Sequence, residues 1–122
     1  MNSSDNPILK LTFDFAVEAV MYSELLESKG KYVISRQFLK SSTSIGANVR
    51  EAQNAESKLD FIHKMKIAAK EADETEYWLL ICQHSPNYPD CKELAAKLDE
   101  IKKVLNKIIG TTKKSIVGFQ SK

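Results

Sequence analysis

Apolar residues recur along this chain at every third or fourth position, in four segments separated by short polar breaks. This spacing places them on one face of an α-helix. In the first segment, Asn6 and Pro7 are suited to cap and open a helix and Gly30 to end it, which predicts a helix over residues 7–29. The apolar face of this helix is wider than one bundle core requires and indicates contact with another subunit. It comprises two adjacent stripes, Ile8, Leu11, Phe15, Ala19, Tyr22, Leu26 and Leu9, Phe13, Ala16, Val20.

Three further helices are predicted from the remaining segments. The second starts near Ser35, and the third follows a capping box formed by Ser57 and Asp60. Pro86 and Pro89 interrupt the pattern before a fourth helix with a heptad-like apolar seam. Four amphipathic helices joined by short loops predict a single all-α domain, an antiparallel up-down-up-down four-helix bundle. The domain spans residues 1–122, and its later helices cover about 35–54, 58–84 and 90–116.

The second helix contains an unusual run of small and polar residues, SSTSIGANVREAQNAES, at positions 41–57. Glycine inside a helix costs about 1 kcal/mol relative to alanine, and Ser, Thr and Asn offer the backbone competing hydrogen bonds. Close packing between helices would favour such residues, because Gly46 and its small neighbours keep the surface of this helix thin. A functional distortion of the helix is the alternative that the sequence leaves open.

The composition fits one soluble, intracellular domain. Of 122 residues, 43% are apolar and 28% are charged, which is enough for one real core. The N-terminal residues do not resemble a secretory signal, and no apolar run reaches membrane-spanning length. We therefore expect a cytoplasmic protein without a membrane partner. Cys82 and Cys91 lack metal-type spacing and are expected to be buried, reduced thiols.

A polar stripe beside the apolar seams is the first candidate for chemistry. Carboxylate-bridged metal sites in bundles use Glu-x-x-His pairs, whereas His63 is preceded by Asp60 at that spacing. The motifs of nucleophilic hydrolases, P-loops and dinucleotide-binding loops are absent from the sequence. We therefore expect no enzymatic activity, no catalytic residue, no metal site and no cofactor. The stripe is expected to make structural hydrogen bonds and ion pairs, with a binding role as the alternative. It comprises Ser44, Asn48, Glu51 and Ala55 on the second helix and Asp60, His63, Ile67, Glu71, Glu74 and Trp78 on the third.

Lysines on the fourth helix are the second candidate. The net charge of the chain is only +2, but residues 90–122 carry eight lysines and four acidic residues. At about 100° per residue, most of these lysines fall on the side of the helix opposite its apolar seam. Such a row can follow the phosphates of a nucleic acid, and a solvated helix face is the alternative. The candidate nucleic-acid-binding residues are Lys92, Lys102, Lys103, Lys107, Lys113 and Lys114.

Residues 41–80 resemble the four-helix bundle proteins encoded by intervening sequences of bacterial 23S ribosomal RNA genes. The resemblance rests on Thr43-Ser44-Ile45-Gly46-Ala47-Asn48, Glu51-Ala52, Glu56-Ser57, Phe61, Ile67-Ala68, Lys70-Glu71-Ala72, Glu74-Thr75 and Tyr77-Trp78-Leu79. For the motif residues it implies packing and interface roles. These residues are Ser44, Gly46, Asn48, Glu51, Ser57, Phe61, Lys70, Glu71, Glu74 and Trp78.

The resemblance also implies a left-handed bundle that assembles into a ring-shaped homopentamer, without catalytic residues. Relatives of the same fold include the accessory proteins of diversity-generating retroelements, which resemble basic barrels that bind RNA and a reverse transcriptase. The leading hypothesis is therefore an oligomeric bundle that binds structured RNA or a nucleoprotein partner through the fourth helix. The alternative is a protein-interaction scaffold that does not bind nucleic acid.

Overall fold

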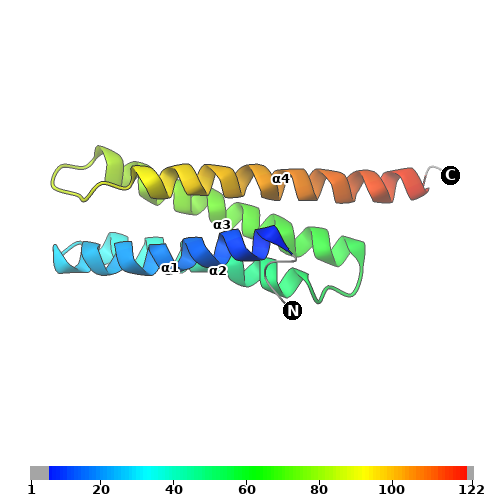
Figure 1. Cartoon of the computed structure of the whole chain (residues 1–122), viewed down its shortest axis with the longest axis horizontal. Coiled ribbons are helices and arrows are strands. Elements are labelled where there is room, and N and C mark those ends of the chain that lie inside the picture. Colours follow the sequence, from blue (N-terminus) through cyan, green and yellow to red (C-terminus); the bar gives the residue numbers. More distant parts are fainter. Residues whose placement is uncertain (1–5, 121–122) are drawn as a thin grey trace.

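The computed structural model describes residues 6–120, with side chains as far as Ile116, and consists of four helices. These are α1 (Pro7–Ser28), α2 (Tyr32–Ala52), α3 (Lys58–His84) and α4 (Lys92–Gln120). Consecutive helices run in opposite directions, joined by short loops at the two ends of an elongated molecule (Figure 1). The predicted all-α class with four helices is confirmed. The left-handed twist stays a prediction.

The turn between α1 and α2 depends on Gly30. This residue has a φ of 78°, which glycine adopts without steric cost, and its N–H donates to the carbonyl of Glu27 at 2.9 Å. The chain then enters α2 at Tyr32, three residues before the predicted start near Ser35. Ser35 does not cap the helix, because its side chain is buried within α2 and bonds to Ser23 of α1 instead.

The start of α3 matches its prediction, whereas both ends of α4 differ. Ser57 accepts a hydrogen bond from the backbone N–H of Asp60 at 3.0 Å, as expected for an N-cap. At the other boundary α4 begins at Lys92, two residues later than predicted, since Pro89 lies in the loop rather than in the first turn. The backbone remains helical through Gly110 to Gln120, beyond the predicted end at 116.

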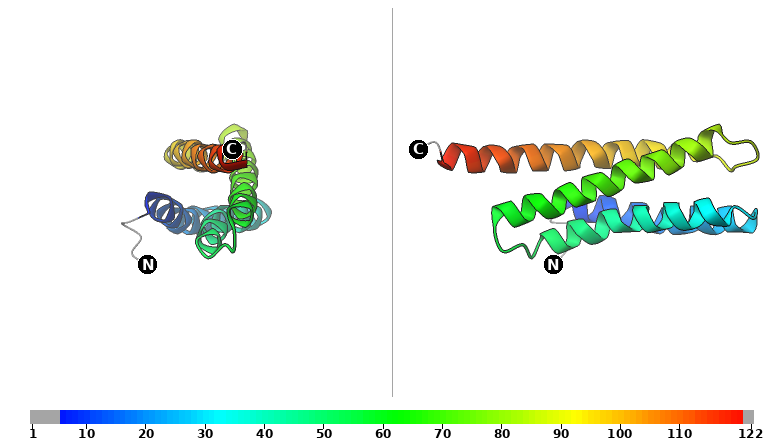
Figure 2. Two further views of the ribbon diagram at one scale, coloured as in Figure 1. Left: turned by 90° about the vertical axis from the view of Figure 1, so that its right-hand side faces the viewer. Right: turned by 180° about the vertical axis from the view of Figure 1, so that it is seen from behind.

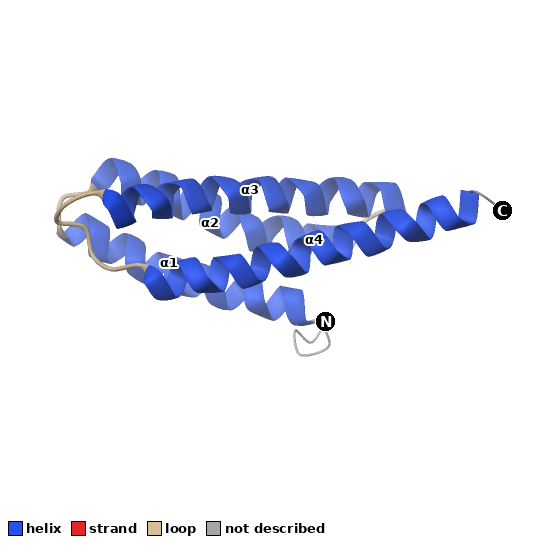
Figure 3. Cartoon of the chain, turned by 90° about the horizontal axis from the view of Figure 1, so that it is seen from above, coloured by secondary structure: helices blue, strands red, loops and turns tan. Residues whose placement is uncertain are grey.

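Each helix packs against its two neighbours in space: α1 against α2, α2 against α3, α3 against α4, and α4 against α1. The end-on view in Figure 2 shows the four helices around a common centre, and Figure 3 shows the last turns of α4 extending past the other helices. The largest fully buried side chains come from all four helices and form one core. They include Phe15, Leu26, Phe38, Ile45, Val49, Met65, Leu79, Leu98, Ile101 and Leu105.

Small residues bring α2 close to its neighbours. A Cβ placed on Gly46 would lie 3.3 Å from the side chain of Thr12 in α1, which is tighter than an ordinary contact. On the opposite flank, the hydroxyl of Thr75 in α3 donates to that of Ser41 at 2.8 Å, with both residues fully buried. Close packing therefore accounts for Gly46 and Ser41.

Candidate nucleic-acid interface

The outward face of α4 presents the predicted row of lysines. Lys92, Lys103, Lys107 and Lys114 are exposed, and Lys113 is exposed beside them. The face lies opposite the buried seam of Leu94, Leu98, Ile101 and Leu105, as the helical period requires. The geometry of the row therefore agrees with the sequence pattern.

Lys102 differs from the other candidates because it points towards α3. Its Nζ lies 3.0 Å from Oδ1 of Asp73 and 2.9 Å from Oε1 of Glu76. Burial alone would lower the pKa of Lys102, but the hydrogen bonds that its ammonium donates to Glu76 and Asp73 raise it above its usual value. With two carboxylates already in contact, Lys102 is a structural cation that holds α4 to α3.

Lys103 has a weaker intramolecular partner, and the remaining candidates have none of opposite charge. Lys103 pairs with Asp99 on the same helix at 3.1 Å, and both side chains are well exposed. Such surface pairs contribute about 0–1 kcal/mol and exchange readily with solvent. Within the part of the chain that the structure describes, the ammonium groups of Lys92, Lys107, Lys113 and Lys114 have no carboxylate within 4.0 Å. These four are the cations most available to a phosphate.

Several residues of the motif support the local structure of α2 and α3. Ser44 donates to the carbonyl of Lys40 and Asn48 donates to the carbonyl of Ser44, each at 2.8 Å. Asn48 therefore bonds within its own helix and not across a helix interface. Ser57 caps α3, and Phe61 packs against the core while remaining partly exposed.

The polar stripe does not converge on one point. Glu51 of α2 approaches Lys64 of α3 at 4.0 Å, whereas Glu74 contacts Trp78 one turn away along α3 at 3.5 Å. Lys70 and His63 are exposed, and Glu71 is half-buried. Among residues 6–116, no group of three His, Cys, Asp or Glu side chains is arranged to hold a metal ion. Interface roles for these motif residues stay a prediction.

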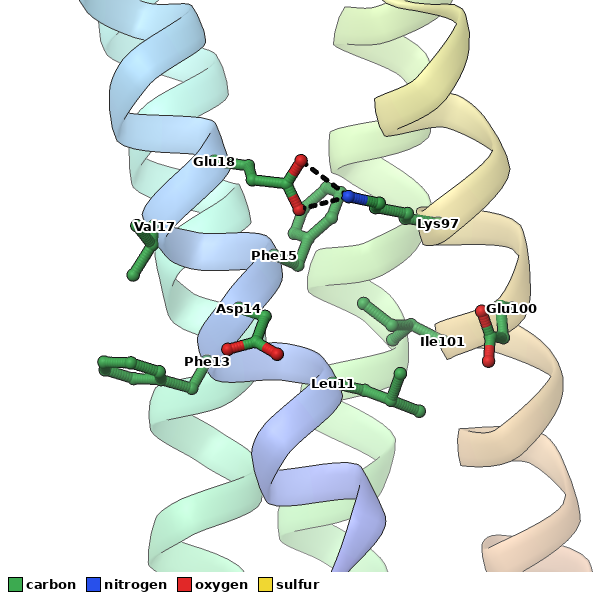
Figure 4. Close-up of a pocket in the computed structure, with 9 residues that line it drawn as sticks. All are labelled: Leu11, Phe13, Asp14, Phe15, Val17, Glu18, Lys97, Glu100 and Ile101. Carbon is green, nitrogen blue, oxygen red and sulfur yellow. Dashed lines mark hydrogen bonds and ion pairs between the residues drawn. The ribbon is translucent and has the colours of Figure 1, made fainter. Parts of the chain in front are cut away.

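A groove separates α1 from α4 on the side where these two helices meet. Its volume is about 530 Å³, and Leu11 of α1 and Ile101 of α4 face each other across it (Figure 4). Lys97 closes one end through a two-oxygen contact with Glu18, at 2.6 and 2.7 Å. The pKa of Lys97 is raised, chiefly by this hydrogen bond. The ion pair ties α4 to α1 across the groove.

The outer face of α1 carries an exposed apolar stripe. Phe13 is 61% exposed and Met21 is 64% exposed, and Phe13 and Val17 point away from the bundle in Figure 4. The stripe consists of Phe13, Val17, Val20, Met21 and Leu25. Contiguous apolar side chains on a protein surface are typical of an interaction surface. Of the wide apolar face predicted from the sequence, Phe13 and Val20 belong to this stripe, whereas Val17, Met21 and Leu25 were not predicted. The buried members of the predicted face are Ile8, Leu9, Phe15, Ala19, Tyr22 and Leu26.

The two thiols lie in the core near the loop between α3 and α4. Cys82 and Cys91 are free and buried, as expected, and burial raises the pKa of both. Tyr22 of α1 reaches this loop and donates its hydroxyl hydrogen to the carbonyl of Pro89 at 2.8 Å. Burial raises the pKa of Tyr22 as well. These groups are neutral core residues at pH 7.

The chain is similar to proteins of one family. Residues 4–107 match the family described as 23S rRNA-intervening sequence protein. The fold is similar to a crystal structure of a protein with unknown function from the S23 ribosomal protein family of Bacteroides thetaiotaomicron VPI-5482, at 41% identity and a TM-score of 0.79, over 84% of this chain and 97% of that chain. No curated protein matches the chain. Among the described residues, no helix is sufficiently long and apolar to span a membrane.

Proposed function

The chain belongs to the 23S rRNA-intervening sequence protein family, and from this premise we propose that it is a non-enzymatic, self-associating helical bundle that binds structured RNA through α4. The observation that carries the proposal is the set of exposed lysines on α4 without a carboxylate partner in the described part of the chain: Lys92, Lys107, Lys113 and Lys114. Unpaired surface cations in a row attract a polyanion, because each phosphate contact releases condensed counterions.

RNA binding is tested by reversing charge on this face. A purified variant with Lys107→Glu and Lys114→Glu is compared with wild type for retention of a pool of structured RNA, at low and at physiological salt. The matched control, Lys29→Glu with Lys40→Glu, makes the same change in net charge on exposed residues of the α1–α2 region. Loss of RNA in the first variant alone supports the proposal, and equal binding by all three proteins refutes it.

Self-association is supported by the apolar stripe on α1. Exposed side chains such as Phe13 and Met21 would be buried if another subunit packed on this face. Repeating the α4 lysines around a ring would add many weak phosphate contacts on one RNA molecule. We propose a homopentamer, following the family resemblance, and the mass of the particle in solution tests that number.

A protein-interaction scaffold is the second candidate function. The same apolar stripe favours it, since a protein partner can cover Phe13, Val17 and Met21 as well as another subunit can. Under this alternative the charge-reversal variant would lose nothing, because the lysines of α4 would be solvated surface residues. An intact oligomer that retains no RNA even at low salt would favour the scaffold.

A further inference from the structure

Charge is segregated along α3. Residues 58–70 contain four lysines and one aspartate, whereas residues 71–84 contain four carboxylates and no lysine or arginine. The second half of α3 supplies Asp73 and Glu76, the two partners of Lys102. The lysines of the first half are mostly not in ion pairs, because only Lys64 of the four has a carboxylate within 4.0 Å of its ammonium in the described structure.

The antiparallel arrangement brings this basic half of α3 beside the basic end of α4. Beyond Glu100 the fourth helix contains no acidic residue, and the later turns of α4 lie at the end of the molecule where α3 begins (Figure 1). Lys58 of α3 donates to the hydroxyl of Ser115 of α4 at 2.6 Å, which fixes the two helices side by side there. Two basic segments about fifty residues apart in sequence thus form one surface.

Two of these lysines are unfavourably close to each other. The positive charge of Lys66 on α3 lowers the pKa of Lys113 on α4. Both side chains are exposed, so solvent could separate them, yet no carboxylate lies between them in the described structure. An anion placed between the two ammonium groups would turn this repulsion into two attractive contacts.

The side chains around the α3–α4 seam favour contacts with phosphates over contacts with bases. Aromatic side chains stack on unpaired bases and are the usual means of binding single strands. The exposed aromatic residues in the described structure, Phe13, Tyr32 and Tyr77, lie on α1, at the start of α2 and in the acidic half of α3. In the basic half of α3 the rings are Phe61, which packs against the core, and the exposed imidazole of His63. Among the described side chains of this end, lysines therefore outnumber the rings that can stack on bases.

We propose that double-helical RNA crosses the α3–α4 seam at this end of the bundle, with one phosphate held between Lys66 and Lys113 and neighbouring phosphates contacted by Lys58, Lys70 and Lys114. This inference rests on the proposed RNA binding. It centres the RNA-binding surface on the junction of α3 and α4 and not along the whole of α4. Binding follows duplex shape and phosphate position and is independent of base sequence. Lys58, Lys66 and Lys70 belong to the site although the pattern of α4 does not contain them.

The test compares charge-neutralising pairs in the full-length protein. The probe is an RNA hairpin with a long paired stem, and affinity is measured over a range of salt concentrations. Lys66→Gln with Lys113→Gln removes the pair at the seam, and Lys92→Gln with Lys103→Gln removes the same charge from the first half of α4. The matched control, Lys29→Gln with Lys40→Gln, lies on the α1–α2 side of the bundle.

We expect the seam variant to lose about tenfold in affinity at low salt, and its salt dependence to flatten by about 0.9 in log–log slope, the value for the one duplex phosphate held between the two lysines. The Lys92/Lys103 variant should lose less, and the control should match wild type. Hairpins with the same shape and a different stem sequence should bind equally. Because all substituted side chains are exposed, the melting temperature of each variant should stay close to that of wild type.

The possible failures point to different conclusions. If the Lys92/Lys103 variant loses RNA and the seam variant does not, RNA binding by α4 stands and the seam site is wrong. If wild type binds a single strand more tightly than the hairpin, the duplex assignment is wrong. If wild type binds no RNA at low salt, both the seam site and the proposed function fail.

Discussion

Gly46 of α2 lies against Thr12 of α1 so closely that a Cβ on the glycine would come within 3.3 Å of both the Cβ and the Oγ1 of Thr12. Thr12 cannot easily yield, because its hydroxyl is buried and donates to the carbonyl of Ile8 at 2.8 Å. The glycine that weakens α2 as an isolated helix therefore sets the separation of α1 and α2.

We expect Gly46→Leu to destabilise the protein by about 1–3 kcal/mol, since the larger side chain overpacks the α1–α2 contact. Gly46→Ala is the control: its added methyl group meets a tight contact, but alanine gains about 1 kcal/mol in helix propensity, so the net change should be small. Urea unfolding followed by circular dichroism measures both. A leucine variant as stable as wild type would show that the contact does not require glycine.

The buried thiols predict a loss of stability at alkaline pH. Burial raises the pKa of Cys82 and Cys91, so the folded state holds two protons that the unfolded chain releases above its ordinary thiol pKa of about 8.5. Because the unfolded state then binds fewer protons, the free energy of unfolding should fall as pH rises above that value and should be insensitive to these groups at pH 6–7. Unfolding free energies at pH 7, 8, 9 and 10 measure this effect.

Replacing both thiols in Cys82→Ala/Cys91→Ala should make the alkaline decline shallower, even if the variant is less stable at every pH because the core has lost volume. The comparison therefore uses the slope and not the absolute stability. Tyr22, whose pKa burial also raises, remains in the variant and should sustain a decline beginning near pH 10. Parallel declines in the two proteins would show that the thiols do not contribute.

The sequence predicted those parts of the fold that depend on neighbours along the chain. The span of α3 was predicted correctly because Ser57 caps its start and a proline-containing segment follows its end. The predicted start of α2 near Ser35 was three residues late, because α2 begins at Tyr32 and the buried side chain of Ser35 contacts Ser23 of α1 from within the helix.

In the candidate interface, too, the sequence predicted what depends on one helix and missed what depends on contacts between helices. Helical period alone placed Lys107 and Lys114 on an outward face, and the structure agrees. The partners of Lys102 lie on another helix, so their effect could not be read from the spacing of lysines in α4. Lys66 was missed for the same reason: its importance comes from Lys113, which is distant in sequence. A count of basic residues in each half of α3 was the signal that could have found it.

Self-association through α1 predicts a change in particle mass. We expect Phe13→Ser with Val17→Ser to dissociate the oligomer, because polar side chains in the centre of the apolar stripe remove much of the area that another subunit would bury. Light scattering after size-exclusion chromatography measures the mass. The matched control, Tyr32→Ser with Val33→Ser, replaces comparably exposed apolar residues at the start of α2 and should leave the mass unchanged.

Either of two results would contradict this prediction. A wild-type protein that is monomeric in dilute solution would remove the need for a subunit contact on α1. An oligomer that survives the Phe13/Val17 substitutions would place the subunit contact on another face. Because both serines are exposed in the monomer, a dissociated variant should still show the helical content of wild type.

The carboxylates of α3 restrain Lys102 and should reduce the affinity of the basic surface for RNA. In Asp73→Asn with Glu76→Gln, the ammonium of Lys102 loses both ionic partners and two negative charges leave the α3–α4 seam. We expect tighter RNA binding and a steeper salt dependence by up to about one unit, corresponding to one added phosphate contact. The loss in stability should be small, about 1 kcal/mol, because both carboxylates are largely exposed. Adding Lys102→Gln to this variant separates the two causes: a gain that persists comes from the removed negative charge, and a gain that disappears comes from the freed ammonium. Unchanged RNA binding in the Asp73/Glu76 variant would mean that RNA does not approach this part of the seam.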